Sequence, residues 1–366
     1  MASQNIFRRA APENHIFRNE EALFPDFLPE QLPGREHEIK ELVYCLQPAA
    51  EKRQPEHALL VGPPGTGKTS TARFVLKELT EYSQRPLPLY INCWEYSSRF
   101  AIFTMLADAL GEFLPRRGIA ADEVFSRIVE IAKKEERVPI IILDEVDRLE
   151  STQEGIQVLY DLCRASEVHS LKTGVIAITN DEQFNTRLDN RIRSSFIQHT
   201  LKFSAYGVPQ LKEILIQRAE IAFMPDALDK DVAPLCAAMA FKRGGDARVA
   251  LALLLSAGKA AERENAPRVL IQHVRKVEEQ TLHSAAVSKA ERKLPEMDEV
   301  DARIVELAKE AGKSGIESGV LYSKMKRLVG ERALRNRIDA LEKSGIIVAE
   351  DKQLSQGRTR VIRVKE

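Results

Sequence analysis

The sequence predicts an α/β domain built on a parallel sheet, followed by an all-helical domain and a C-terminal winged helix. Three observations lead to this prediction. Short apolar runs alternate with helical stretches from about residue 58 to residue 201. No strand pattern remains between about residues 202 and 288, where helical periodicity continues. Three helical stretches and two strand-like runs then close the chain, which is the winged helix pattern.

Length and composition restrict the class of protein. The 366 residues suffice for two or three domains. Apolar residues make up 44% of the chain and charged residues 30%, which is typical of a soluble globular protein and excludes a disordered chain. No apolar run approaches the roughly 20 residues of a membrane span, and the first residues carry no signal-peptide core. We therefore expect a cytoplasmic or chromosome-associated protein with no membrane partner.

Charge and cysteine usage exclude two kinds of site. Lys and Arg together number 54, as do Asp and Glu, so the formal net charge is zero. This balance excludes a general basic coat for nucleic acid, and any DNA contact would depend on local charge. The four cysteines lie too far apart for a Cys-x-x-Cys zinc site and are expected as buried thiols in a reducing compartment. The seven histidines are scattered, and the sequence indicates no metal-ligand cluster.

Polar segments, prolines and the loss of helical periodicity indicate the expected domain boundaries. Residues 1–20 are polar with an early proline and are expected to form a flexible tail. Residues 289–297 are charged and lack periodicity, so they are expected to form a linker. These limits leave an α/β base at 21–201, a helical lid at 202–288 and a winged helix at 298–366.

Each domain has expected elements. In the base, helical spacing begins near Glu36, and the expected strands are Ala58–Val61, Leu87–Ile91, Pro139–Leu143, Gly174–Ile178 and Ile197–Leu201. In the lid, a helical run starts with Leu211, Ile214, Leu215 and Arg218. In the winged helix, three helices contain Val300–Ala311, Val320–Leu328 and Glu331–Ser344, and two strands follow at Ile346–Val348 and Thr359–Val364.

The segment after the first expected strand fits the phosphate-loop pattern G-x-x-x-x-G-K-[ST]. It follows a strand and opens a helix, which is the context that this motif requires. Its glycines let backbone N–H groups surround phosphate oxygens, and the helix N-terminus adds a favourable dipole. The predicted nucleotide-binding residues are Gly62, Pro63, Pro64, Gly65, Thr66, Gly67, Lys68 and Thr69. Among them, Lys68 would meet the β- and γ-phosphates and Thr69 would hold Mg²⁺.

Two carboxylates end the third expected strand. Asp144 and Glu145 follow the apolar run Ile140–Leu143. Asp144 would join Thr69 in the Mg²⁺ shell, and Glu145 would polarise the attacking water. Such a run is also seen in any buried strand that meets a polar loop, but its place after a phosphate loop favours the catalytic interpretation.

Three further polar residues are candidates for the same site. Asn180 follows the strand at Gly174–Ile178 and would help to orient the water, although a turn-forming asparagine is the alternative. Arg191 projects from an apolar helix face and would reach a neighbour's γ-phosphate, unless it is a solvated side chain. Arg248 would lie in the first turn of a helix capped by Asp246, where the dipole disfavours a cation, so a bound anion is expected there, with a snorkelling arginine as the alternative.

Together these motifs resemble an AAA+ ATPase. The finer similarity is to the archaeal replication initiators related to origin recognition complex subunit one and cell division control protein six. It covers nearly the whole chain after the tail. Besides the ATPase motifs and the winged helix, it rests on the stretches His15–Asn19, Leu32–Glu36, Ile178–Asp181 and Gly245–Arg248.

The resemblance implies roles for particular residues. Asn180 matches sensor 1, Arg191 matches the arginine finger and Arg248 matches sensor 2. The adenine of ATP or ADP would border on Leu32, Pro33 and Arg35. Arg116 and Arg117 lie where this family carries a helical insertion that touches DNA, with a solvated loop pair as the alternative.

The third helix of the winged helix has the composition of a DNA-reading element. On a helical wheel its apolar residues share one face, and the polar residues pointing away are Arg332, Arg335, Asn336 and Lys343. Arginine pairs with guanine and asparagine with adenine in the major groove. The hairpin loop at 353–360 would form the wing, with Arg358 and Arg360 on phosphate or in the minor groove. A protein-binding winged helix is the alternative.

The resemblance implies an ATP-dependent protein that binds origin duplex DNA, initiates replication and helps to recruit or load the replicative helicase. Slow hydrolysis would make the ATP or ADP state a switch. A paralogous initiator, or self-association on DNA, is also implied. Two other classes remain open. A clamp-loader-type ATPase would carry a C-terminal oligomerisation collar, and a nucleotide-gated transcriptional regulator would need a sensing domain for which little length remains.

Overall fold

The computed structural model describes residues 15–112, 118–196, 199–279, 299–312, 315–325, 328–343, 347–354 and 357–364. The chain divides into two compact units, Met1–Gln280 and Thr281–Glu366, and each is described by itself. The expected linker and the two arginines Arg116 and Arg117 lie outside the described residues. In the described segments, no helix has both the length and the apolar character that a bilayer crossing needs.

The base of the first unit is a five-stranded parallel sheet with the strand order β2-β3-β4-β1-β5. Its strands are β1 (Ala58–Val61), β2 (Pro86–Asn92), β3 (Val138–Asp144), β4 (Gly174–Thr179) and β5 (His199–Lys202). All seven residues of the internal strand β3 are buried, as expected when helices cover both faces of a parallel sheet. The prediction of an α/β fold with a parallel sheet is therefore confirmed.

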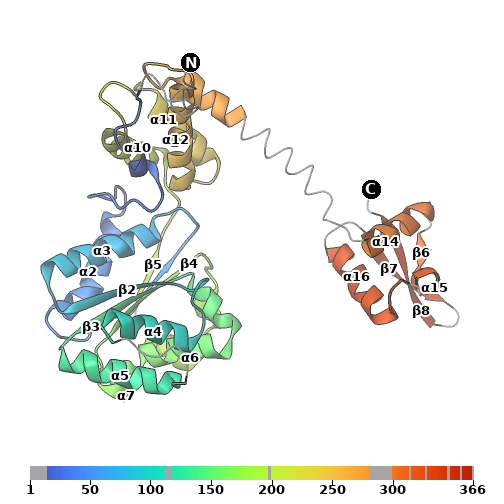
Figure 1. Cartoon of the computed structure of the whole chain (residues 1–366), viewed down its shortest axis with the longest axis horizontal. Helices are drawn as coiled ribbons and strands as arrows, with labels where there is room; N and C mark the ends of the chain where they lie inside the picture. The colour runs from blue at the N-terminus through green and yellow to red at the C-terminus, as the bar shows by residue number, and fades with distance from the viewer. Residues whose placement is uncertain are drawn as a thin grey trace, which may run out of the picture. The chain divides into compact units, whose positions relative to one another are not determined.

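Helices cover both faces of this sheet (Figure 1). One face packs on α2 (Glu36–Ala50) and α3 (Lys68–Tyr82). The other packs mainly on α4 (Arg99–Ala109), α5 (Ala121–Lys134) and α6 (Gln153–Cys163). The shorter helices of the base are η2 (Val146–Ser151), α7 (Ala165–His169), α8 (Phe184–Arg187) and α9 (Asn190–Phe196).

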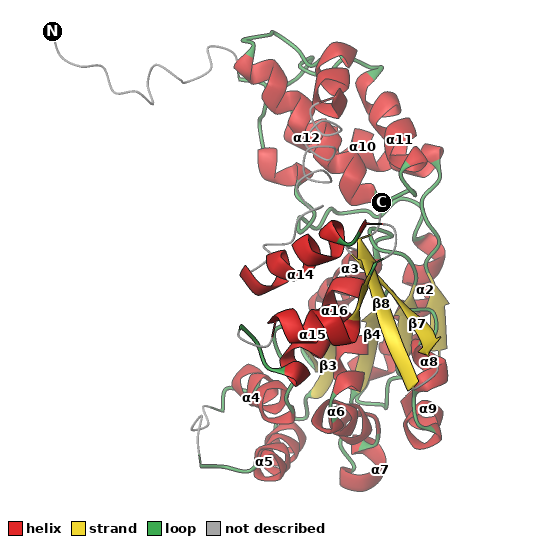
Figure 2. Cartoon of the chain, turned by 90° about the vertical axis from the view of Figure 1, so that its right-hand side faces the viewer, coloured by secondary structure: helices red, strands yellow, loops and turns green. Residues whose placement is uncertain are grey.

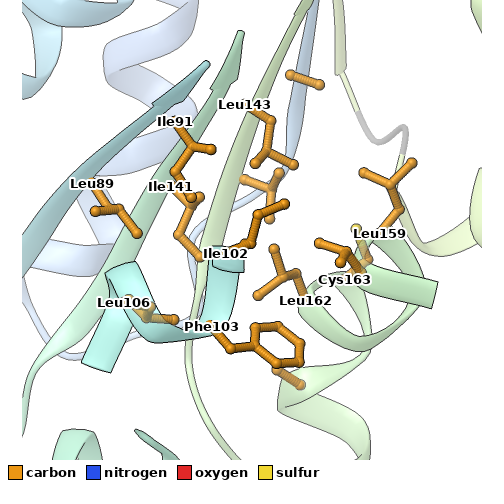
Figure 3. Packing of buried hydrophobic residues seen from close by; sticks show 14 of the residues in the cluster. Leu89, Ile91, Ile102, Phe103, Leu106, Ile141, Leu143, Leu159, Leu162 and Cys163 are labelled. Atoms are coloured by element: carbon orange, nitrogen blue, oxygen red, sulfur yellow. The ribbon is translucent and has the colours of Figure 1, made fainter. Parts of the chain in front are cut away.

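The pleat of the strands distributes their side chains between two cores. In β3, Ile140 and Ile142 belong to the core under α2 and α3, whereas Ile141 and Leu143 belong to the opposite one. Figure 3 shows the second core, in which Ile141 and Leu143 of β3 belong to one cluster with Ile102 and Phe103 of α4. This packing holds the strand ends that carry the polar residues in a fixed arrangement.

The lid contains α10 (Val208–Ala222), α11 (Val232–Lys242) and α12 (Ala247–Arg263), drawn together in Figure 2. The N-terminal segment belongs to the same core, because Ile16 is 1% exposed within it and η1 (Glu20–Leu23) packs there. The N–H groups of Arg18 and Asn19 donate to the carbonyl oxygen of Ala222. Residues 15–20 are thus held on the lid, whereas we expected a flexible tail, because their apolar side chains complete its core.

The second unit contains α14 (Glu299–Glu310), α15 (Ser318–Met325) and α16 (Glu331–Lys343) on a three-stranded sheet. Its strands are β6 (Ile316–Glu317), β7 (Ile347–Leu354) and β8 (Gly357–Val364), in the antiparallel order β6-β8-β7. Three helices and a hairpin are the expected winged helix. The strands extend further than predicted, so Arg358 and Arg360 lie on β8 instead of in a loop.

Candidate functional site

A pocket of about 380 Å³ opens where the carboxyl ends of β3 and β4 meet the lid. Ligands of α/β sheets bind at this end of the strands, and the volume is that of a small-molecule site. Its walls come from the segment at 25–33, the phosphate loop, the strand ends and the lid helices α10 and α12. Among the predicted residues, those that line it are Leu32, Pro33, Pro64, Gly65, Thr66, Gly67, Lys68, Thr69, Asp144, Glu145, Asn180 and Arg248.

The phosphate loop depends on glycines with left-handed backbone. Gly65 has φ +71° and Gly67 has φ +85°, a region that other residues rarely adopt. A Cβ atom at Gly65 would lie 1.7 Å from Asp246 Oδ1, and one at Gly67 would lie 2.5 Å from the Tyr206 hydroxyl. Directly after the loop, α3 begins at Lys68, so the unpaired N–H groups of a 15-residue helix lie beside the pocket. The loop is therefore shaped to bind an anion.

Lys68 is folded onto the loop that carries it. Its Nζ donates to the carbonyl oxygens of Gly62 and Pro63 at 2.7 and 2.8 Å and to Asn180 Oδ1 at 2.8 Å. Burial lowers the pKa of Lys68 to about 8, an effect that nearby Asp144 opposes. Asn180 follows β4, so the predicted sensor 1 residue and the phosphate-loop lysine are in contact.

The two predicted magnesium ligands touch each other. Thr69 Oγ1 donates to Asp144 Oδ2 at 2.8 Å, and the Tyr90 hydroxyl donates to the same oxygen at 2.9 Å. Hydroxyl and carboxylate oxygens are the donors that Mg²⁺ prefers. Since both groups line the pocket beside Lys68, they fit a Mg²⁺ ion held with a nucleotide. Tyr90 is a member of this group that we did not predict.

Glu145 has an unusual backbone conformation and a raised pKa, and both are common at functional sites. Its φ is +55°, an unusual value for a residue with a side chain. Its N–H donates to Asp144 Oδ1 at 3.0 Å. Burial raises the pKa of Glu145, and the charges of Asp144 and Asp147 raise it further. A carboxylate whose pKa is raised accepts a proton more readily, which suits a general base.

The lid contacts the phosphate loop through the start of α12. Asp246 caps this helix by accepting from the Arg248 N–H at 2.8 Å, as predicted. The Ala247 N–H donates to the Gly65 carbonyl oxygen at 3.1 Å. The Arg248 guanidinium pairs with Asp246 at 3.1 Å and lines the pocket, with 53% of its side chain exposed. Arg248 thus lies in the pocket in which a phosphate is expected.

Arg35 lies behind the phosphate loop, whereas we expected it to border the adenine. Only 4% of it is exposed, and it is not among the residues that line the pocket. It donates to the carbonyl oxygens of Thr66 at 2.8 Å and Ser204 at 2.7 Å, and its guanidinium lies 4.0 Å from the centroid of the Tyr206 ring. The side chain therefore supports the phosphate loop without lining the pocket.

Arg191 is exposed near the start of α9 and is not among the residues that line the pocket. Its N–H donates to Asp189 Oδ1 at 2.8 Å. The geometry within one chain thus brings Asn180 and Arg248 to the pocket, but not Arg191.

In the second unit, α16 has the predicted division of faces. Leu334, Ile338 and Leu341 are buried in the core of the winged helix. The exposed residues include Arg332, Arg335 and Asn336. The Arg335 guanidinium lies 5.7 Å from the Tyr322 ring centroid. The polar face of the helix is therefore accessible.

A hollow of about 270 Å³ separates α16 from β8 and is lined by Arg335, Asp339 and Arg360, among others. The Arg360 guanidinium donates to Asp339 at 2.8 Å across it. Lys343 ends α16 and Arg358 lies on β8, but their side chains fall outside the described residues.

Two family models match this chain. The AAA ATPase domain matches residues 31–176, and the Cdc6 AAA+ ATPase-type lid domain matches residues 212–279. An ORC1-type DNA replication protein of Pyrococcus abyssi is 35% identical over 370 residues, which cover 96% of this chain and 87% of that protein. The chain belongs to the ORC1-type DNA replication proteins.

Further relatives agree with this assignment. ORC1-type DNA replication protein 1 of Aeropyrum pernix is 35% identical, with 95% of this chain and 91% of that protein covered. The structure of the Aeropyrum pernix ORC1 protein in complex with DNA has a TM-score of 0.71 and 34% identity, and the match covers 95% of this chain and 94% of that one. The predicted resemblance, AAA+ fold and ATPase activity of this ORC1-type chain are confirmed.

Arg218 lines the nucleotide pocket of this ORC1-type chain and is buried, but it was not predicted as a site residue. Arg218 on α10 is 3% exposed, and it donates to the carbonyl oxygens of Phe27 at 2.8 Å and Phe24 at 2.7 Å. Burial lowers the pKa of Arg218 to about 10. The sequence carried one indication of this residue. Arg218 is a charged residue at helical spacing from Leu211 and Leu215, which pack in the core of the lid. It fastens the segment that forms one wall of the pocket.

Proposed function

We propose that this ORC1-type chain is an ATP-dependent initiator that binds origin duplex DNA and helps to recruit or load the replicative helicase. The observation that carries the proposal is a single pocket lined by the phosphate loop, β3, β4 and the lid helix α12. A separate winged helix with an exposed polar recognition face supports the DNA-binding part. In functional terms, residues 21–201 would be the base, except that η1 packs on the lid, residues 202–288 would be the lid and residues 298–366 the DNA-binding domain.

In the nucleotide site, Lys68 would release its contacts with the loop and bind the β- and γ-phosphates. Thr69 and Asp144 would hold Mg²⁺, which supplies charge neutralisation when it is bound. Glu145 would take a proton from the attacking water, and Asn180 would orient that water. These roles use side chains already within one pocket.

The lid would report which nucleotide is bound. Arg248 is held by Asp246 at 3.1 Å, and a γ-phosphate would compete with that carboxylate for the guanidinium. Because the Ala247 N–H beside it donates to the phosphate loop, a change at Arg248 would alter the contact between lid and base. ATP and ADP would thus stabilise different lid positions.

DNA would be bound by the winged helix and by the insertion of the base. Arg335 and Asn336 have the side chains that read guanine and adenine in the major groove. Arg332 and Lys343 would lie on the same outward face of the helix, Arg358 and Arg360 would reach phosphate or the minor groove, and Arg116 and Arg117 would touch DNA from the base. The relative from Aeropyrum pernix was solved in complex with DNA, which supports this use of the fold. The protein would act in the cytoplasm on the chromosome.

Arg191 would act only in an assembly. It is exposed and is not among the pocket-lining residues, so a second copy or a paralogous initiator would have to present it to a neighbouring γ-phosphate. DNA that holds two chains side by side would provide this arrangement.

Sequencing the DNA that co-purifies with the protein tests the proposed function. We expect fragments from one or a few loci that carry repeats beside a replication start. The Arg335→Ala chain serves as the matched control and should lose this enrichment while it retains nucleotide binding. Enrichment of promoters instead would favour a transcriptional regulator and contradict the initiator.

A further inference from the structure

Three residues with different ligand atoms meet at the end of the sheet opposite the nucleotide pocket. Cys45 lies on α2, Glu56 precedes β1 and His199 begins β5. One thiol, one carboxylate and one imidazole atom all lie within 4.8 Å of one another. These residues are far apart in sequence, so no spacing pattern announces the cluster. The parallel pairing of β1 with β5 places them together.

The backbone fixes the position of each of these residues. The Glu56 N–H donates to the Cys45 carbonyl oxygen at 3.0 Å. The His199 N–H donates to the His57 carbonyl oxygen at 3.3 Å, and His199 pairs with Ala58 in the sheet. In addition, His199 Nε2 contacts a carboxylate oxygen of Glu56. The cluster therefore belongs to the ordered base and does not depend on surface side chains meeting by chance.

The donor set indicates which cation would bind. A thiolate, an imidazole and a carboxylate are the usual ligands of Zn²⁺, whereas Mg²⁺ and Ca²⁺ select oxygen. Cys45 is buried at 1% exposure, whereas the side chains of Glu56 and His199 are 41% and 35% exposed. Glu41, one helical turn before Cys45, adds negative charge near the sulfur. The site is thus closed on the thiol side and open to a water ligand on the other.

We propose that Cys45, Glu56 and His199 bind one Zn²⁺ ion, with water as the fourth ligand. The ion would be structural, because the cluster lies at the amino ends of β1 and β5 and the nucleotide pocket lies at the carboxyl ends. It would fasten the edge strand β5, which has four residues and pairs with β1, to α2. Since β5 leads into the lid, this fastening would stabilise the start of that connection.

Cobalt titration of the tag-free, nucleotide-free full chain tests the proposal. Co²⁺ replaces Zn²⁺ and produces a near-ultraviolet charge-transfer band only when a thiolate coordinates it. We expect one Co²⁺ per chain with this band, displaced by Zn²⁺, and loss of the band in Cys45→Ser. Cys236→Ser is the matched control, because Cys236 is equally buried on α11 and belongs to no such ligand group among the described residues, so its band should persist.

Two results would overturn the proposal: absence of the band in the unmodified chain, or an unchanged band in Cys45→Ser. If Cys45→Ser does not fold, Glu56→Gln and His199→Gln replace it, since both side chains are partly exposed. Each should weaken Zn²⁺ binding and abolish the rise in Tm that Zn²⁺ causes. X-ray absorption of the zinc-loaded chain should show one sulfur at about 2.3 Å and one nitrogen at about 2.0–2.1 Å. A shell of oxygen and nitrogen alone would contradict the site.

Discussion

Lys68 illustrates how single residues prepare the nucleotide site. Its ammonium group is satisfied by two loop carbonyls and by Asn180. A bound phosphate would replace these contacts, so the ammonium group would exchange neutral acceptors for a charged one. Asp144 is similarly occupied, by Thr69 and Tyr90. The groups predicted to bind phosphate and Mg²⁺ are thus held in place by one another.

Lys68→Ala is expected to abolish detectable ATP binding, because it removes the cation beside the β- and γ-phosphates. Glu145→Gln should bind ATP normally but hydrolyse it about a hundredfold more slowly or worse, since the proton acceptor is lost. Fluorescent-nucleotide titration and phosphate release measure the two effects. Wild-type hydrolysis by Glu145→Gln would show that another group is the base.

ATP affinity should depend on pH through Lys68. Burial lowers the pKa of Lys68 to about 8, and bound phosphates would favour the charged form. Below about pH 8 the lysine is already charged, so affinity is constant. Above it, binding must take up a proton, and affinity falls by up to about tenfold per pH unit. Titrations between pH 7 and 9 check this, with Lys68→Arg as the control that should bind with a flatter profile.

At the scale of elements, α16 should contact the bases of DNA and β8 should contact its phosphates. Arg335→Ala should weaken binding to the specific site by about 1–3 kcal/mol and relax sequence preference, because a base contact is lost. Arg358→Ala should weaken binding to all sequences and lower the salt slope by about one, because a phosphate contact is lost. Anisotropy of labelled duplexes at several salt concentrations separates the two. Unchanged duplex affinity after deletion of residues 298–366 would contradict both.

The sequence predicted those elements whose signals are local. The strands of the base lie within about two residues of their predicted positions, because apolar runs, glycines and caps act within a few residues. The support of the loop by Arg35 could not be predicted, since its partners Ser204 and Tyr206 lie about 170 residues away. For the same reason, the packing of Ile16 into the lid and the position of Arg218 above the pocket wall depended on tertiary structure.

Arg35 connects the base, the phosphate loop and the segment that leads into the lid. Its several guanidinium donors should therefore contribute to the stability of the whole base and lid. Arg35→Lys keeps the charge but cannot reach Thr66, Ser204 and Tyr206 together. We expect a loss of about 2–4 kcal/mol in the free energy of unfolding, together with weaker ATP binding. Denaturant unfolding measures the first effect. Arg53→Lys, an exposed substitution, should be nearly neutral, and equal effects of both would refute the role.

At the scale of an assembly, the proposed role of Arg191 requires two chains. Arg191→Ala chains lack the finger, and Lys68→Ala chains lack a working nucleotide site. Mixing them should restore part of the ATPase activity, because the Lys68→Ala chain supplies Arg191 to the intact site of its neighbour. Phosphate release from the mixture, compared with each variant alone, measures this. A chain that stays monomeric with ATP and DNA under all conditions would contradict the trans role.

The chain crosses between lid and base twice. It leaves the lid after Phe27 and enters the base at α2, and it returns through residues 203–207 to α10. Arg35 fastens the two crossings together through Ser204 and Tyr206. A body tied to another at two neighbouring points turns about the line that joins them and resists twisting in other directions. The lid should therefore rotate relative to the base about an axis through the two crossings, which pass close to Arg35. Rotation about this one axis would open or close the pocket at the γ-phosphate end.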